Sequence, residues 1–155
     1  MGAVLFYHLT RDSIAQTLGQ LLPKALAAGM RIELRGREMA ALERLDQQLW
    51  QGPEEGFLPH GLAGGPHDAL QPVLLTLSDT LQESTTCLMS LEGAPIAADE
   101  VAGLTRSCVL FEGGSPDAVD HARGQWRALT EAGCAAEYWS QENGPWEKKA
   151  ESAGS

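Results

Sequence analysis

The sequence predicts an α/β protein whose mostly parallel sheet is covered by helices on both faces. Two observations predict this fold. Short apolar or β-branched runs alternate along the chain with longer segments in which apolar residues recur every three or four positions. Glycine or proline separates most of these segments. Alternating strands and helices indicate parallel strands joined by helical crossovers, so we expect a Rossmann-like architecture.

The first half of the chain predicts two strand and helix pairs. Residues 4–8 are short, apolar and aromatic, which favours a strand, and residues 14–26 have helical spacing that stops at Gly29. Residues 30–34 predict a second strand. Residues 39–50 then carry one apolar stripe, which predicts a helix that ends at Trp50.

The middle of the chain reads as a loop followed by strands. Residues 51–72 are rich in glycine and proline and predict a long ordered loop that holds one short strand. Three β-rich runs and one short helix follow, at residues 73–77, 86–91, 99–104 and 107–111, of which 99–104 is the helix.

The last long helix is expected from Pro116 to Ala132. Ser115 is a suitable cap, proline suits the first helical position, and Gly133 ends the helix. Residues 134–139 predict an edge strand. We expect one α/β domain over residues 1–147 and a polar, disordered tail over residues 148–155.

The charge of the chain argues against direct binding to DNA. Eleven Lys and Arg against twenty-one Asp and Glu give a formal net charge of −10, which disfavours contact with a phosphate backbone. A small basic patch can still hold an anion, because screening at physiological salt acts over about 8 Å. No apolar run is long enough to cross a membrane, so we expect a cytoplasmic protein without a membrane partner.

No catalytic or metal site is predicted. The cysteines Cys87, Cys108 and Cys134 are isolated and predict free thiols. The histidines fall in four separate elements, without the spacing of metal ligands; they are His8, His60, His67 and His121. We expect no cofactor.

Two glycine-rich loops test the alternative of a nucleotide-dependent enzyme. Neither residues 61–65 nor Gly113-Gly114-Ser115 matches G-x-G-x-x-G or a Walker A sequence with its lysine. Both loops therefore favour turns. A small nucleotide-dependent α/β enzyme is kept as the alternative function.

Two segments of the chain together resemble the chi subunit family of bacterial DNA polymerase III. They are Leu45-Asp46-Gln47-Gln48-Leu49-Trp50 running into Gly56-Phe57-Leu58-Pro59-His60-Gly61-Leu62, and Ala122-Arg123-Gly124-Gln125-Trp126-Arg127 running into Glu131-Ala132-Gly133. The resemblance implies a non-catalytic accessory subunit of the replicative polymerase. In this family the subunit links the clamp loader, through the psi subunit, to the acidic C-terminal tail of single-stranded DNA-binding protein, and contacts DNA only indirectly.

The resemblance also implies a binding site for that tail. Arg123 and Arg127 fall on basic positions of the family's site and Trp126 on its aromatic position, while Trp50 and Phe57 match an aromatic pair beside the pocket. One position departs from the family. Val119 stands where the family can carry a further basic residue, so this site has less positive charge.

The residue chemistry alone leaves a structural interpretation open. Two guanidiniums beside an indole suit a peptide that ends in an aromatic residue and a carboxylate. Alternatively, Trp126 borders the core while both arginines are solvated or pair with Asp120 or Glu131. Trp50 and Phe57 can likewise fill the edge of the core.

Overall fold

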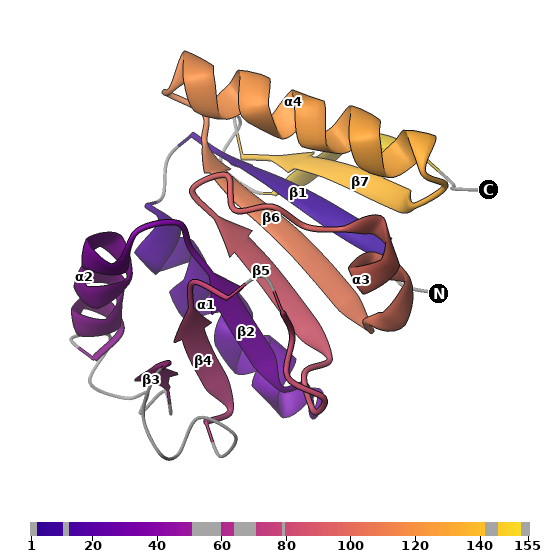
Figure 1. The fold of residues 1–155 in the computed structure, drawn as a ribbon. Helices are drawn as coiled ribbons and strands as arrows, with labels where there is room; N and C mark the ends of the chain where they lie inside the picture. The colour runs from indigo at the N-terminus through magenta and orange to yellow at the C-terminus, as the bar shows by residue number, and fades with distance from the viewer. Residues whose placement is uncertain are drawn as a thin grey trace.

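The computed structural model describes residues 3–10, 13–50, 60–63, 71–78, 80–141 and 146–152, except for the side chain of Trp50. Figure 1 shows how the elements are arranged. In chain order they are β1 (Ala3–Leu9), α1 (Ile14–Ala27), β2 (Ile32–Arg35), α2 (Met39–Trp50), β3 (Gly61–Leu62), β4 (Val73–Thr76), β5 (Cys87–Leu91), α3 (Ala98–Gly103), β6 (Arg106–Glu112), α4 (Pro116–Glu131), β7 (Ala135–Ser140) and β8 (Glu147–Ser152).

The described strands form one sheet in the order β3-β4-β2-β5-β6-β1-β7-β8. All neighbouring pairs are parallel except β7 and β8, which are antiparallel. The first strand therefore lies inside the sheet, between β6 and β7. The predicted fold class is confirmed.

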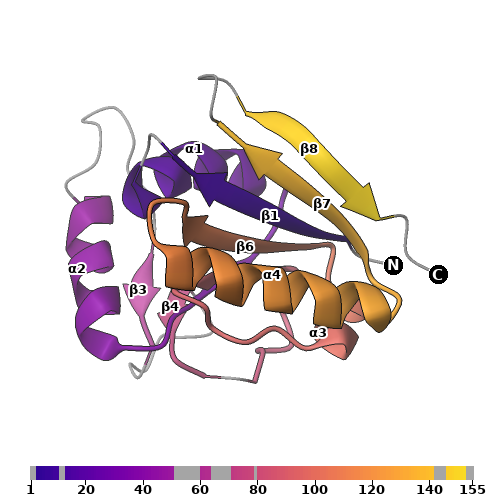
Figure 2. The ribbon, with the colours of Figure 1, turned by 90° about the horizontal axis from the view of Figure 1, so that it is seen from above.

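Helices cover both faces of the sheet (Figures 1 and 2). On one face, which we call the α1 face, the buried apolar residues of α1 and α2 pack on alternate residues of the strands. On the other, the α4 face, α3 and α4 do the same. Strand β1 shows the alternation, because Val4 and Phe6 belong to the α4 face and Leu5 and Tyr7 to the α1 face.

Helix α1 ends before Gly29 and helix α4 begins after Ser115, as the sequence predicts. Ser13 caps α1 in a capping box with Gln16, and Gly29 follows the helix with φ 83°, a conformation that glycine adopts without strain. The hydroxyl of Ser115 accepts a hydrogen bond from the backbone N–H of Ala118, and Pro116 is the first residue of α4.

Two predictions about the C-terminus are wrong. Residues 148–152 do not form a disordered tail, because β8 pairs with β7 and five of its backbone positions are in register with that strand. Strand β7 is consequently not an edge strand. The indole of Trp146, which precedes β8, packs edge-on against the ring of Tyr7 on the α1 face, with ring centroids 5.2 Å apart. Residues 153–155 lie outside the described residues.

Candidate functional site

The three α4 residues of the predicted site lie together on one flank of the helix. Arg123 and Arg127 are one helical turn apart and exposed, and Trp126 is half-buried. The Trp126 indole packs edge-on against Phe6 of β1, at a centroid distance of 5.4 Å, and against Tyr138 of β7, at 6.1 Å. The indole thus borders the core, as the structural interpretation expected, and its position is fixed from below.

Neither guanidinium of this pair has an ion-pair or hydrogen-bond partner among the described residues. Within the described parts of the chain, Arg123 and Arg127 form no ion pair and their side chains form no hydrogen bond. The alternative that they pair with Asp120 or Glu131 is therefore not found there. Both positive charges remain available to an external anion.

An aromatic cluster lies beneath this flank of α4. It joins Trp126 through Tyr138 to His8 and Phe111, with ring centroids 5.1 to 6.1 Å apart. The Nδ1 atom of His8 lies 2.6 Å from the hydroxyl of Tyr138, a hydrogen-bond distance. Because Trp126 contacts β7, the flank that carries Arg123 faces the β7 side of the sheet.

Two connected hollows lie on the opposite flank of α4. One, of about 580 Å³, opens at the carboxyl ends of β5 and β6, and a smaller one, of about 350 Å³, continues along the helix. His121 and Gln125 line both, and each side chain also hydrogen-bonds the turn after β5, at the carbonyl oxygens of Gly93 and Ala94. These two residues lie on the other side of the helix from Arg123, at 100° per residue.

The larger hollow carries charges of both signs. Arg37 and Arg44 line it together with Glu92, Glu112 and Asp117. Partial burial and the neighbouring carboxylate of Glu38 raise the pKa of Glu92. This mixture does not favour an acidic peptide, whereas the flank with Arg123 and Arg127 presents positive charge beside an aromatic ring.

The second aromatic pair of the predicted site lies outside the side chains that the structure describes. Trp50 is the last residue of α2, and α2 packs on the α1 face of the sheet, opposite α4 (Figure 1). Phe57 lies outside the described residues. The role assigned to Trp50 and Phe57 in the tail site therefore stays a prediction.

Comparison with known proteins identifies the family. The family model described as DNA polymerase III chi subunit, HolC, matches residues 1–137. The chain belongs to this family. No curated protein matches the sequence. Membership makes this chi-family protein an accessory component of DNA polymerase III in DNA replication. The match ends inside β7, so Tyr138 and all of β8 lie beyond it.

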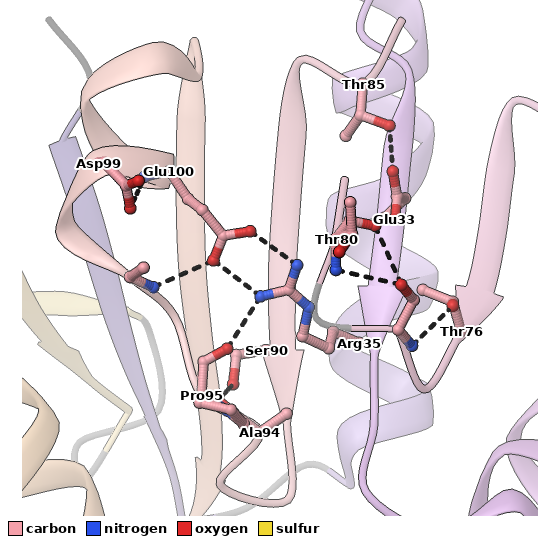
Figure 3. Close-up of polar contacts among 12 residues, drawn as sticks. Glu33, Arg35, Thr76, Thr80, Thr85, Ser90, Ala94, Pro95, Asp99 and Glu100 are labelled. Carbon is pink, nitrogen blue, oxygen red and sulfur yellow. Dashed lines mark hydrogen bonds and ion pairs between the residues drawn. The ribbon is translucent and has the colours of Figure 1, made fainter. Parts of the chain in front are cut away.

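The charged residues inside the sheet of this chi-family protein serve its packing. Figure 3 shows Glu33 and Arg35, which are 1% and 2% exposed and point to the α4 face where two loops cover β2. Arg35 pairs with Glu100 of α3 and donates to the carbonyl oxygen of Pro95. Glu33 accepts hydrogen bonds from the hydroxyl of Thr85 and the backbone N–H of Gln82. Local sequence signals did not predict this network, because charged residues in a strand usually face water.

The glycine-rich loop before α4 has a structural role. A Cβ on Gly113 would lie 2.1 Å from Nε2 of His8, so the glycine gives room to that imidazole. The Ser115 hydroxyl caps the helix. The backbone N–H of Ala118, which a phosphate at this helix end would need, already donates to the Ser115 hydroxyl, and Glu112 and Asp117 line the adjacent hollow. Both features weigh against the nucleotide-dependent alternative.

The cysteines and His60 also have structural surroundings. The three cysteines are free and buried, as predicted. A hydrogen bond to Cys87 and complete burial raise the pKa of Cys108, which keeps it a thiol. His60 is buried, with Nε2 3.2 Å from the carbonyl oxygen of Asp46. Over the described ranges, no group of three potential ligands could hold a metal ion, and no helix could span a membrane.

Proposed function

We propose that this protein is a replisome adaptor that binds the acidic C-terminal tail of single-stranded DNA-binding protein through Arg123, Trp126 and Arg127, while another face holds the psi subunit of the clamp loader. The observation that supports the tail site best is the pair of exposed guanidiniums beside a fixed indole, because neither guanidinium has an ion-pair or hydrogen-bond partner among the described residues. In this proposal a guanidinium pairs with the terminal carboxylate of the tail, and the indole contacts its last aromatic side chain.

The overall charge of −10 fits an adaptor that avoids the nucleic acid itself. Repulsion from the phosphate backbone reduces non-specific binding to DNA, and the local positive flank of α4 still attracts an acidic peptide. A micromolar contact, worth about 8 kcal/mol, is sufficient when many tails are displayed along coated single-stranded DNA. Such a role places the protein in the cytoplasm, at the replication fork.

The test is a titration of the full chain with a fluorescent peptide that carries the acidic tail and its free carboxylate. Arg123→Glu and Arg127→Glu should each weaken binding by more than about 1 kcal/mol, which is roughly fivefold, and added salt should weaken binding of the unaltered protein. Arg44→Glu is the matched control, because it makes the same charge change on an exposed residue of the opposite hollow.

Two results would redirect the proposal. If Arg44→Glu weakened binding and Arg123→Glu did not, the peptide would lie in the mixed-charge hollow. If the peptide failed to bind the unaltered protein and ATP or NAD raised its melting temperature, the enzyme alternative would be favoured. Capture of partners from native extract tests the psi contact, and Trp50→Ala tests whether the end of α2 belongs to that contact or to the tail site.

A further inference from the structure

Tyr138 lies where β7 meets the arginine-bearing flank of α4. Its ring is half-buried and packs edge-on against Trp126, at 6.1 Å and an interplanar angle of 73°. The Tyr138 hydroxyl is held by Nδ1 of His8 at 2.6 Å. Two neighbours, one on the helix and one on β1, therefore fix the orientation of this phenol.

The helix geometry places Arg123 on the flank of α4 that turns toward β7. With 100° per residue, Trp126, Val119 and Arg123 follow one another around this flank. Val119 and Trp126 are packed with Tyr138 in the same apolar cluster, and Arg123 is the exposed residue next to them. A peptide side chain that contacts Trp126 from this flank meets the strand that carries Tyr138.

We propose that Tyr138 is a further peptide-binding residue, which forms the sheet-side wall of the tail site opposite Arg123. The wall has the chemistry to receive the terminal aromatic side chain of an acidic peptide, because the Trp126 and Tyr138 rings are half-buried, lie edge to face, and can each pack against a further aromatic ring. The peptide carboxylate then lies near the guanidinium of Arg123. This inference rests on the proposed function and adds a residue beyond the segment that matches the family, which ends at residue 137.

The chain offers a direct test because it has two tyrosines, on opposite faces of the sheet. Protein labelled with 3-fluorotyrosine gives one ¹⁹F NMR signal for Tyr138 and one for Tyr7, and Tyr138→Phe assigns them. Titration with the tail peptide should shift the Tyr138 signal in a saturable manner and leave the Tyr7 signal in place. If the peptide binds and the Tyr138 signal does not move, the inference is overturned.

Substitution gives an independent measurement. Tyr138→Ala should weaken peptide binding roughly fivefold. Trp139→Ala is the matched control, because Trp139 is the next residue of β7 and faces the opposite side, where its indole hydrogen-bonds Glu137; it should leave the affinity unchanged. Unchanged affinity in Tyr138→Ala, with loss of binding in Arg123→Glu, would remove Tyr138 from the site and leave the proposed function intact. If neither Tyr138→Ala nor Arg123→Glu weakened binding, both the inference about Tyr138 and the proposed tail site would be removed.

Discussion

Arg35 and Glu100 form a bidentate ion pair that joins β2 to α3. The Nη1 atom of Arg35 lies 2.9 Å from Oε1 of Glu100, and Nη2 lies 2.8 Å from Oε2. The arginine side chain is 2% exposed and the glutamate side chain 16%. The same guanidinium also donates to the carbonyl oxygen of Pro95, so one buried cation fixes both the loop after β5 and the helix that follows it.

Removal of the Glu100 charge should destabilise the protein strongly. In Glu100→Gln the Arg35 guanidinium stays buried without its counter-ion, which is expected to cost about 3 kcal/mol of unfolding free energy. Urea unfolding measures this. The control is Glu151→Gln, which breaks the exposed pair with Lys148 and should cost less than about 1 kcal/mol. Equal losses in the two variants would contradict the importance given to the buried pair.

Acid should weaken the same contact. Partial burial of the Glu100 carboxyl opposes its ionisation, but hydrogen bonds from Arg35 and from the backbone N–H of Ala97 outweigh this effect and lower its pKa. A carboxyl with a lowered pKa in the folded state contributes stability above its unfolded pKa, and this contribution is lost as pH falls through the folded pKa. Unfolding free energies measured from neutral to acidic pH should therefore fall more steeply in the unaltered protein than in Glu100→Gln.

Gly113 should not tolerate a side chain. Its Cβ would lie 2.1 Å from Nε2 of His8 and 2.9 Å from the backbone oxygen of Leu9, so we expect Gly113→Ala to cost about 1 to 3 kcal/mol. Adding His8→Ala should recover only part of this loss, because the backbone contact remains. Gly114→Ala is the control, since apart from its chain neighbours no atom of the described residues lies within 4 Å of its Cβ position, and thermal unfolding should show little change.

A new cation at position 119 should strengthen the proposed tail site. Val119→Lys places an ammonium one turn before Arg123, at the position where the resemblance implies that a basic residue is allowed, and a lysine stem can cover the apolar cluster while its charge reaches water. We expect severalfold tighter binding of the acidic peptide at low salt, with the gain reduced as salt is added. Val119→Met keeps the apolar stem without the charge and should bind like the unaltered protein. A gain in both variants would show that charge is not the cause.

Local sequence signals predicted most of the fold. Ser115 and Gly29 marked helix ends correctly, because caps and left-handed turns depend on a few neighbouring residues. Strand β8 was missed, because its side chains are polar and mostly exposed, and its pairing depends on backbone hydrogen bonds with β7.

Only the part of the proposed tail site that lies on a single helix was predictable from the sequence. Helical spacing was sufficient to group Arg123, Trp126 and Arg127. The face on which α2 packs depends on the crossover pattern of the whole sheet, so the sequence could not place α2 relative to α4. Tyr138 gave no local signal, because its contacts to His8 and Trp126 come from β1 and α4.

The position of β1 has a consequence for synthesis of the protein. Residues 3–9 leave the ribosome long before both strands that neighbour β1 are complete, because those strands end at Glu112 and Ser140. At about 5 to 20 residues per second, the N-terminal strand waits for at least several seconds before both of its edges can pair. During that interval its apolar residues need protection by chaperones or by temporary contact with α1, and the nascent chain is then most exposed to aggregation.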